Sequence, residues 1–472
     1  MALQDAPVYE LCVLGAGPAG YVAALRAAQL GATVALIEEE EVGGTCLNHG
    51  CIPTKALVES GRALRMIRRA SEYGLRLDGR VEADFAAVVA RKDRIVARLV
   101  RAVKELLLQR GVSLIRGRAA VQRAGSVVIS TGGEPVEVRY RSLLVATGSR
   151  PLVPEIEGRE LGCVLDVRRL LGSTRLPRSL VVVGGSAVGI EMSDIYASFG
   201  TRVTVLEKFS ILPRVDQQLA RRYLAIATRR GIAIQEGADV QSVEQLDTGM
   251  ARVHYVAGGA ARYVDGELVL LATGGQPNGA GLGLERLGVA ITPQGAIQVD
   301  SCLRTAVPGV YAAGDVVGGW MLAHVAAHEG LVAAENALGG ERHMDYSAVP
   351  NCIFTEPEIA SVGMTEVQAR TVGFDAQVCR FPFSANGRAM TMGEEEGVVR
   401  LVYERGSGRI LGVHILGPLA SELIVEGALA VKEGLNVRQL AEIMHQHPTL
   451  SEAVMEAGMA AAYGEALHFR AL

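Results

Sequence analysis

The chain has 472 residues, 49% of them hydrophobic, so it is long enough for about three compact domains, each with its own core. Its 47 basic and 51 acidic residues give a formal charge of −4, which argues against a basic nucleic-acid-binding face. Residues 1–5 lack the basic stretch that begins a secretion signal, and no apolar run approaches the roughly 18 residues of a membrane span. We therefore expect a cytoplasmic globular protein that binds neither nucleic acid nor membrane.

The first motif is a glycine-rich turn between a strand and a helix. It comprises a strand over 11–14, Gly15, Gly17, Gly20, a helix over 21–30, a strand over 34–37 and Glu38. In such a turn the first glycine makes the bend, the second lets a pyrophosphate approach the backbone, and the third allows close packing. The acid that ends the second strand bonds ribose hydroxyls. The motif predicts a dinucleotide site, with a merely glycine-rich turn as the alternative.

Two of the seven cysteines, Cys46 and Cys51, lie five residues apart in a segment that contains several glycines. Residues at this spacing in an ideal helix have Cα atoms about 8–9 Å apart, beyond the roughly 7 Å that a disulfide spans. The glycines permit the distorted backbone that brings the two together. Pro53 suits the first turn of a helix through Lys55, and a helix N-terminus favours a thiolate. The pair is predicted to be a redox disulfide; two buried thiols that never meet are the alternative.

The remaining cysteines show no metal-ligand spacing and are expected to be ordinary core thiols: Cys12, Cys163, Cys302, Cys352 and Cys379. Residues 84–110 place apolar side chains at helical spacing and predict a long amphipathic helix. Strands are predicted over 112–115, 127–130 and 143–145. The last leads into Ala146-Thr147-Gly148-Ser149, and the prolines after it mark a domain boundary at residue 150.

A second unit repeats the first. It comprises a strand over 180–183, Gly184, Gly185, Ser186, Gly189, a helix, a strand over 203–206 and Glu207. The first glycine and the strand-end acid are 23 residues apart in both units, and each unit later closes on Ala-Thr-Gly, at 146–148 and 272–274. Ser186 departs from the pattern, since its Cβ lies where a pyrophosphate approaches. Glu207 can bond a 2′-hydroxyl and would repel a 2′-phosphate, which favours NAD over NADP.

From residue 279 the chain is expected to return to the first unit, with a strand over 310–313 that ends at Asp315. Asp315 is a candidate for bonding a sugar-like chain, or else the N-cap of a helix. Alternating segments and two helices then predict a separate α+β domain, over 398–403, 410–415, 420–433 and 437–443. The predicted domains are 1–150, 151–278, 279–346 and 347–472.

Near the C-terminus, His447 precedes a proline and lies five residues before Glu452. One hypothesis makes His447 a general base whose ring is held by Glu452. The alternative is a capping box formed by Thr449 and Glu452, with the histidine in an ordinary loop. A redox dithiol elsewhere in the chain needs a base, which favours the first hypothesis.

Together these motifs resemble the FAD-dependent pyridine nucleotide-disulfide oxidoreductases over nearly the whole chain. The resemblance rests on GGTCLNHGCIPTK at 43–55, both glycine turns, ATGSRP at 146–151, AAGDV at 312–316, MLAH at 321–324 and HPTLSE at 447–452. It implies an α/β fold with two Rossmann-like dinucleotide-binding domains and a C-terminal α+β dimerisation domain. It also implies a homodimer in which His447 and Glu452 of one subunit complete the site over the disulfide of the other.

The resemblance implies FAD at the first unit and NAD at the second. The expected FAD contacts are Gly15, Gly17, Gly20, Glu38, Gly44, Thr45, Lys55, Gly117, Thr147, Gly148, Ser149, Asp315, Met321, Leu322, Ala323 and His324. The expected NAD contacts are Gly184, Gly185, Ser186, Gly189, Glu191, Glu207, Val240 and Gly274. The catalytic set is expected to be Cys46, Cys51, His447, Glu452, Lys55 and Glu191.

Within the family, Leu450 favours members that oxidise dihydrolipoyl groups on the lipoyl domains of 2-oxoacid dehydrogenase or glycine cleavage complexes. In that reaction Cys46 would exchange with substrate, Cys51 would face the flavin, and Lys55 would pair with Glu191. The alternatives are a glutathione- or mercuric-reductase-like enzyme and a non-catalytic flavoprotein subunit. A mercuric reductase needs C-terminal cysteines, and residues 464–472 contain none. Four departures from the family pattern, at Glu39, His49, Ser186 and Gly275, remove no reacting group.

Overall fold

The computed structural model describes residues 7–467, so the expectations about residues 1–5 and about residues 468–472 lie outside the described part. Its first sheet has the strand order β3-β2-β1-β6-β5-β4, with β17 paired to β6. The strands are β1 Val8–Leu14, β2 Val34–Glu38, β3 Ser113–Arg116, β4 Arg118–Arg123, β5 Ser126–Ser130, β6 Val136–Val145 and β17 Val310–Ala312. The chain therefore returns to this sheet late, through the parallel pair β6–β17.

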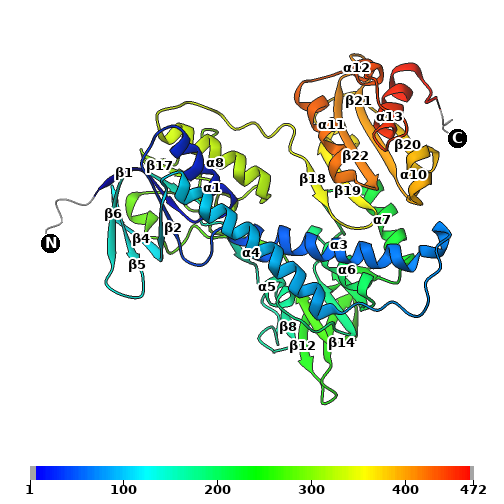
Figure 1. The fold of residues 1–472 in the computed structure, drawn as a ribbon, viewed down its shortest axis with the longest axis horizontal. Helices are drawn as coiled ribbons and strands as arrows, with labels where there is room; N and C mark the ends of the chain where they lie inside the picture. Colours follow the sequence, from blue (N-terminus) through cyan, green and yellow to red (C-terminus); the bar gives the residue numbers. More distant parts are fainter. Residues whose placement is uncertain (1–6, 468–472) are drawn as a thin grey trace.

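The centre of the first sheet is parallel and covered by helices, as in a nucleotide-binding fold. Helix α1, Pro18–Gln29, packs against α8, Ala323–Ala337, which lies more than 300 positions further along the chain. Small side chains make this contact close: a Cβ at Gly330 would lie 2.2 Å from the backbone oxygen of Ala19. The packed pair appears on the left of Figure 1.

The second unit has a parallel sheet in the order β11-β10-β9-β15-β8. Its strands are β8 Val164–Leu165, β9 Ser179–Val183, β10 Arg202–Glu207, β11 Ala233–Glu236 and β15 Leu268–Leu271, and its helices are α5 Val167–Leu171, α6 Ala187–Phe199 and α7 Gln217–Arg229. A three-stranded antiparallel sheet that the sequence analysis missed lies beside it: β12 Asp239–Gln245, β13 Ala251–Ala257 and β14 Ala260–Gly266. The two units are joined where β7, Ser149–Pro151, pairs with β16, Gly275–Pro277.

The C-terminal part forms a separate antiparallel sheet in the order β18-β19-β22-β21-β20. Its elements are β18 Asn351–Ile353, β19 Glu358–Gly363, α9 Glu366–Thr371, β20 Ala376–Pro382, α10 Gly387–Met392, β21 Val398–Glu404, β22 Ile410–Gly417, α11 Ala420–Lys432, α12 Val437–Glu442 and α13 Glu452–Tyr463. Short 3-10 turns lie at Ala70–Tyr73, Leu284–Leu287, Asp315–Val317 and Phe383–Ala385. The lobe stands at the upper right of Figure 1, apart from the first sheet.

Two long helices cross the middle of the molecule: α3, Cys51–Arg68, and α4, Phe85–Gln109. Asp84 caps α4 by accepting a hydrogen bond from the Ala87 amide at 3.0 Å. In Figure 1, α3 runs from the first unit toward the right, with α6 below it and β18 above. Within residues 7–467, no helix combines the length and the apolarity needed to cross a bilayer.

Candidate active site

The glycine turn of the first unit is shaped by close backbone contacts. A Cβ at Gly15, where φ is +97°, would lie 2.4 Å from the Ala146 oxygen, and one at Gly20 would lie 1.8 Å from the Gly15 oxygen. A Cβ at Gly17 would meet nothing nearer than 3.9 Å, so this glycine leaves the N-terminus of α1 open. The turn therefore provides a cradle that fits a pyrophosphate.

The acid at the end of each second strand closes its glycine turn. Glu38 Oε2 accepts the Ala16 amide at 2.7 Å, and Glu207 Oε2 accepts the Gly185 amide at 2.6 Å. Burial raises the pKa of Glu38, although the hydrogen bond from the Ala16 amide acts in the opposite direction. The two acids thus lie at equivalent places in the two units, within reach of a ribose bound over the turn.

The second glycine turn has the same close backbone contacts as the first, but its middle position is a serine rather than a glycine. Cβ atoms at Gly184 and Gly189 would lie 2.4 Å and 2.0 Å from backbone oxygens. Ser186 is the N-cap of α6 in extended conformation, and its hydroxyl makes no capping hydrogen bond. Gly274 has φ of +107° and faces open space, while Val240 lies half-buried on β12. The turn can receive a second dinucleotide, with the Ser186 side chain at its edge.

The cysteine pair spans a break between two helices. Cys46 lies in the short helix α2, Gly44–His49, and Cys51 is the first residue of α3, which places Pro53 in the first turn as expected. Between them Gly50 has φ of −134° and ψ of −109°, a conformation that leaves the helical region. This distortion replaces the continuous helix that would have kept the sulfurs apart.

Both cysteines are free thiols in this structure, and their side chains hydrogen-bond to each other. The hydrogen bond from Cys46 lowers the pKa of Cys51 to about 7, with a further contribution from the positive charge of Lys55. The same hydrogen bond, together with burial, raises the pKa of Cys46. Cys51 is therefore the sulfur that ionises near neutral pH, while Cys46 keeps its proton.

Lys55, one turn after Cys51, pairs with Glu191 of α6 at 2.9 Å. Its ammonium also lies 4.3 Å from the centre of the Phe354 ring, and the Phe354 amide donates to Glu191 at 2.9 Å. Glu191 is 6% exposed. Three separate parts of the chain thus hold one partly buried ion pair next to the thiols.

Sequence analysis missed Phe354, which lies just after β18 in the C-terminal part. No local motif marks it, because its contacts with Lys55 and Glu191 exist only after the domains have assembled. The same holds for Asn278, whose carbonyl accepts the Thr147 hydroxyl at 2.9 Å.

Asp315 lies deep between the first unit and the link to the second. Its Oδ2 accepts the Ser149 hydroxyl at 2.7 Å, and burial raises its pKa. Gly314, not Asp315, is the N-cap of the 3-10 turn at this point, so the alternative of a capping role is wrong. Asp315 is therefore available to a polar ligand.

The other expected FAD contacts lie around the same sheet or at its rim. Gly117 and Gly148 have positive φ, of +151° and +67°, and Gly148 faces open space. Met321 also has positive φ, Leu322 is the N-cap of α8, and Ala323 begins that helix. His324 Nε2 bonds the Pro350 oxygen at 2.8 Å, while Gly44 lies against Gly17 and Thr45 comes next in α2.

The histidine hypothesis gains geometric support over the capping box. His447 Nδ1 and Glu452 Oε1 are 2.9 Å apart, and Glu452 also accepts the Thr449 amide at 2.8 Å. The Thr449 hydroxyl donates to the Gln446 oxygen, and α13 begins at Glu452 with Ser451 as N-cap. The reciprocal capping box is therefore not formed.

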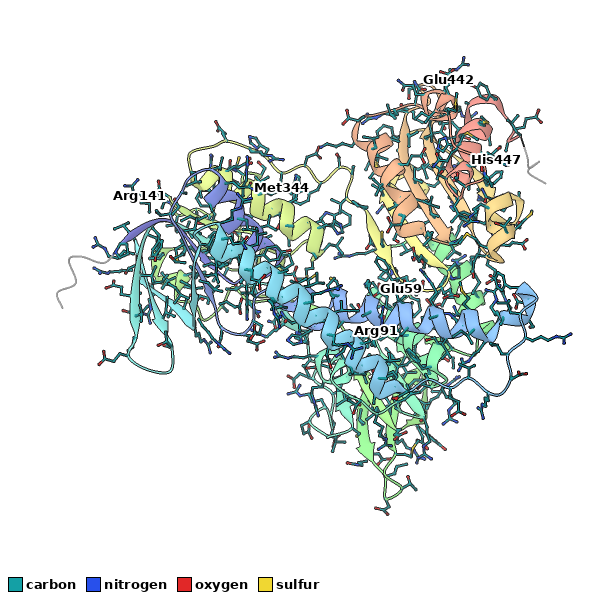
Figure 2. The ribbon with its side chains drawn as sticks, viewed as in Figure 1. Glu59, Arg91, Arg141, Met344, Glu442 and His447 are labelled. Atoms are coloured by element: carbon teal, nitrogen blue, oxygen red, sulfur yellow. The ribbon has the colours of Figure 1, made fainter. Side chains whose placement is uncertain are left out.

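Within one chain, this histidine pair lies apart from the cysteines. The His447 side chain is 76% exposed and lies on the C-terminal lobe in Figure 2, whereas α3 begins beside the first unit. A single chain therefore does not bring His447 to Cys46.

Two dinucleotide-binding units and a pair of thiols place the protein in the class of oxidoreductases that pass electrons between thiols and nucleotides. Residues 9–330 match the family model of pyridine nucleotide-disulphide oxidoreductases, and residues 349–458 match that family's dimerisation domain. The chain belongs to this family. Its cofactors are FAD and NAD, and it forms a homodimer.

Individual relatives are similar over nearly their whole length. The chain is 39% identical to the dihydrolipoyl dehydrogenase of Geobacillus stearothermophilus, over 95% of each chain. Among solved structures it is similar to LpdA from Mycobacterium tuberculosis, with a TM-score of 0.89, 31% identity, and coverage of 96% of this chain and 99% of that one. It is also similar to the HOCl-induced flavoprotein disulfide reductase RclA from Escherichia coli, solved as a Cu(II) complex, with a TM-score of 0.86, 30% identity, and coverage of 96% and 99%.

Proposed function

We propose that the protein oxidises protein-bound dihydrolipoyl groups to lipoyl groups and passes the electrons to NAD⁺. The observation that carries this proposal is the pair of touching thiols, in which the pKa of Cys51 is lowered to about 7 beside the Lys55–Glu191 pair. Relatives named dihydrolipoyl dehydrogenase, similar over nearly the whole chain, support the choice of substrate.

The reaction begins as thiol–disulfide exchange. In the oxidised enzyme Cys46 and Cys51 are joined; a substrate thiolate attacks the sulfur of Cys46, the bond between the cysteines breaks, and Cys51 leaves as a thiolate. The second substrate thiolate then attacks the substrate sulfur of the mixed disulfide, which releases the lipoyl disulfide and leaves Cys46 reduced. A low pKa makes Cys51 a good leaving group, because leaving-group thiols of lower pKa depart faster.

His447 of the partner subunit is the base that deprotonates the substrate thiols. In the tautomer that the pairing favours, its Nδ1–H donates to Glu452, and Nε2 is left free to accept a proton. The homodimer supplies this residue because one chain does not place it near its own cysteines.

The first unit would hold FAD through the Gly17 cradle, Glu38 and Asp315, and the second would hold NAD at Gly184 and Glu207. FAD, when bound, supplies the two-electron step that returns the cysteine pair to its disulfide and hands a hydride to NAD⁺. Lys55, held by Glu191, stabilises the Cys51 thiolate during that step. Overall, a dithiol and NAD⁺ give a disulfide, NADH and a proton.

The protein partners are proposed to be the lipoyl domains of 2-oxoacid dehydrogenase or glycine cleavage complexes. They would present the dihydrolipoyl group to the Cys46 side of the site. The cytoplasmic location expected from the sequence remains part of this proposal.

The test is NAD⁺ reduction by dihydrolipoamide with purified protein, compared with NADPH-driven reduction of disulfides. Rapid NADH formation with dihydrolipoamide is expected, and its absence would refute the proposal. The second candidate is a disulfide reductase, which the structural similarity to RclA favours. Such an enzyme would reduce disulfides with NADPH faster than it reduces NAD⁺ with dihydrolipoamide. A flavin that NADH does not bleach would instead indicate a non-catalytic subunit.

A further inference from the structure

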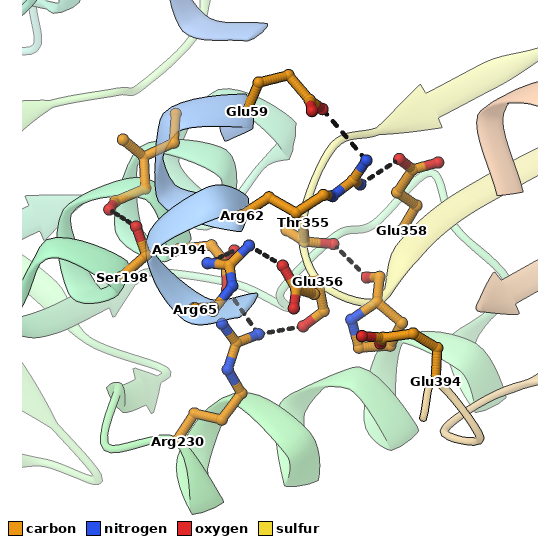
Figure 3. Close-up of polar contacts among 12 residues, drawn as sticks. Glu59, Arg62, Arg65, Asp194, Ser198, Arg230, Thr355, Glu356, Glu358 and Glu394 are labelled. Atoms are coloured by element: carbon orange, nitrogen blue, oxygen red, sulfur yellow. Dashed lines mark hydrogen bonds and ion pairs between the residues drawn. The ribbon is translucent and has the colours of Figure 1, made fainter. Parts of the chain in front are cut away.

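A buried group of charges joins α3, the second unit and the C-terminal lobe. Asp194 of α6, which is 3% exposed, lies 3.0 Å from Arg230 Nη1 and 3.7 Å from Arg65 Nη1. Glu356, in the turn between β18 and β19, pairs with Arg65 through its carboxylate and accepts from Arg230 through its backbone oxygen. Figure 3 shows both arginine side chains pointing toward Asp194 and Glu356.

Burying these charged side chains costs free energy, because they lose their hydration. Burial raises the pKa of Asp194, and the charges of Arg230 and Arg65 oppose that shift. A buried ion pair often contributes little net stability compared with apolar side chains of the same shape, and its best-attested use is to specify register. The cluster is therefore suited to fixing how its elements lie on one another.

The register in question is that of α3 on α6. Glu191 and Asp194 are three residues apart and lie on the same face of α6, toward α3. On α3 their partners, Lys55 and Arg65, are ten residues apart, a distance of about 15 Å along the helix. The two helices are thus held together at two separate points.

The helices also approach closely toward the C-terminal end of α6. A Cβ at Gly61 of α3 would lie 2.3 Å from a side-chain oxygen of α6, that of Ser198. Arg68 also donates to the Ser198 backbone oxygen at 2.9 Å. Contacts between α6 and α3 therefore run from Glu191 to Ser198, and Asp194 lies within them.

We propose that Asp194 is a positioning residue for the redox site, which, through Arg65 and Arg230, fixes α6 against α3 and keeps Glu191 on Lys55. The inference rests on the proposed function. The charge of Lys55 lowers the pKa of Cys51 and the charge of Glu191 raises it, so a lysine released from Glu191 stabilises the thiolate more. Loss of Asp194 therefore strengthens the thiolate from a distance, without contact to thiol or nucleotide.

The test variant is Asp194→Asn in the FAD-containing dimer, which removes the charge and keeps the shape. Two readouts report on the thiolate: the pH midpoint of the long-wavelength thiolate–flavin band after reduction, and the pH dependence of thiol alkylation by iodoacetamide. Both midpoints are expected to fall by about half a pH unit or more, since removal of nearby negative charge favours the thiolate.

The matched control is Arg62→Gln. Arg62 lies on the same helix, and its ion pairs go to Glu59 and to the buried Glu358 of β19 rather than to α6. This variant is expected to lose thermal stability and to shift both midpoints less than Asp194→Asn does, since the Arg62 charge acts on Asp194 without forming an ion pair with it. If the control variant shifts the two pH midpoints as much as Asp194→Asn does, the effect comes from a general loss of stability. That outcome would overturn the inference.

The double variant Asp194→Asn/Arg65→Gln removes one charge of each sign. It is expected to recover part of the thermal stability that Asp194→Asn loses while keeping the lowered midpoints, and it carries the test if the single variant does not fold. A thiolate–flavin band that is present in the unmodified protein but unmoved in these variants refutes this inference alone. Absence of the band in the unmodified protein refutes the proposed function and this inference with it.

Discussion

The two nucleotide-binding units have matching backbone hydrogen bonds, yet only the first carries the cysteine pair. The Gly43 amide donates to the Ala16 oxygen at 2.8 Å in the first unit, and the Leu212 amide donates to the Gly185 oxygen at 2.9 Å in the second. Both donors come 28 residues after the first glycine of their unit, and both have positive φ, of +99° and +51°.

The two units differ in the residues directly after this shared turn. In the first unit Gly44 comes next, and its missing Cβ, which would lie 2.7 Å from the Gly17 Cα, lets α2 start directly against the glycine turn. In the second unit Leu212 buries its side chain to 1% exposure and Pro213 comes next. The comparison teaches that one backbone turn either delivers a reactive segment to a nucleotide site or fills a core, depending on two residues.

The largest expected effect comes from removing the cysteine pair, which only the first unit has. Cys51→Ser leaves no disulfide to be reduced, so NAD⁺ reduction by dihydrolipoamide should fall by about a thousandfold or more, the scale of losing an essential nucleophile. Steady-state assay measures this loss. Retained yellow colour and an unchanged melting temperature would show that the protein is intact; substantial remaining turnover would contradict the mechanism.

Matched glycine substitutions should separate the two units. Gly15→Ala and Gly184→Ala each place a Cβ 2.4 Å from a backbone oxygen, so each distorts its own turn. The first is expected to yield protein with little bound FAD. The second should keep FAD and raise the KM for NAD⁺ about tenfold or more, by loss of one well-placed contact of about 1.4 kcal/mol. Flavin absorbance and NAD⁺ titration check this, and equal flavin loss in both would refute the assignment.

The pH dependence of the thiols should also differ between the units. The pKa of Cys51 is lowered to about 7, so its alkylation in the reduced enzyme should rise with pH through a midpoint near that value. Cys163 of the second unit has its pKa raised by burial, so it should react only at higher pH. Mass spectrometry after timed alkylation resolves the two sites; a Cys51 midpoint at the ordinary thiol value would contradict the lowered pKa.

The smallest effect is expected from a substitution that makes the second glycine turn like the first. Ser186→Gly removes the side chain at the edge of the second turn, where the first has Gly17. The KM for NAD⁺ should fall by about two- to fivefold, within the range of a single weak contact of up to about 1 kcal/mol. Unchanged affinity in this variant would mean that the serine stands clear of the pyrophosphate.

The sequence predicted those parts of the fold that depend on local pattern. The strands around Leu14 and Val183, their glycine turns and the long helix after Asp84 all lie within a few residues of their expected places. The antiparallel strands β12–β14 were missed, because their alternation is interrupted and one face is exposed. The break between the two cysteines was expected from the glycines around them, and Gly50 makes it.

The candidate site was predictable where motif residues are close in sequence and not where contacts cross domains. The neighbours Cys46, Cys51 and Lys55 are read from one short segment. By contrast, Phe354 on Lys55 and Arg65 on Asp194 depend on three domains meeting, and neither residue belongs to a motif.

The exposed His447, placed on a lobe away from its own cysteines, has a consequence for mixed assemblies. If each reaction centre borrows its histidine across a twofold axis, two defective chains can repair each other. A dimer of one Cys51→Ser chain and one His447→Gln chain contains one centre with both defects and one with neither. Co-expression of two inactive genes should therefore restore turnover that neither shows alone.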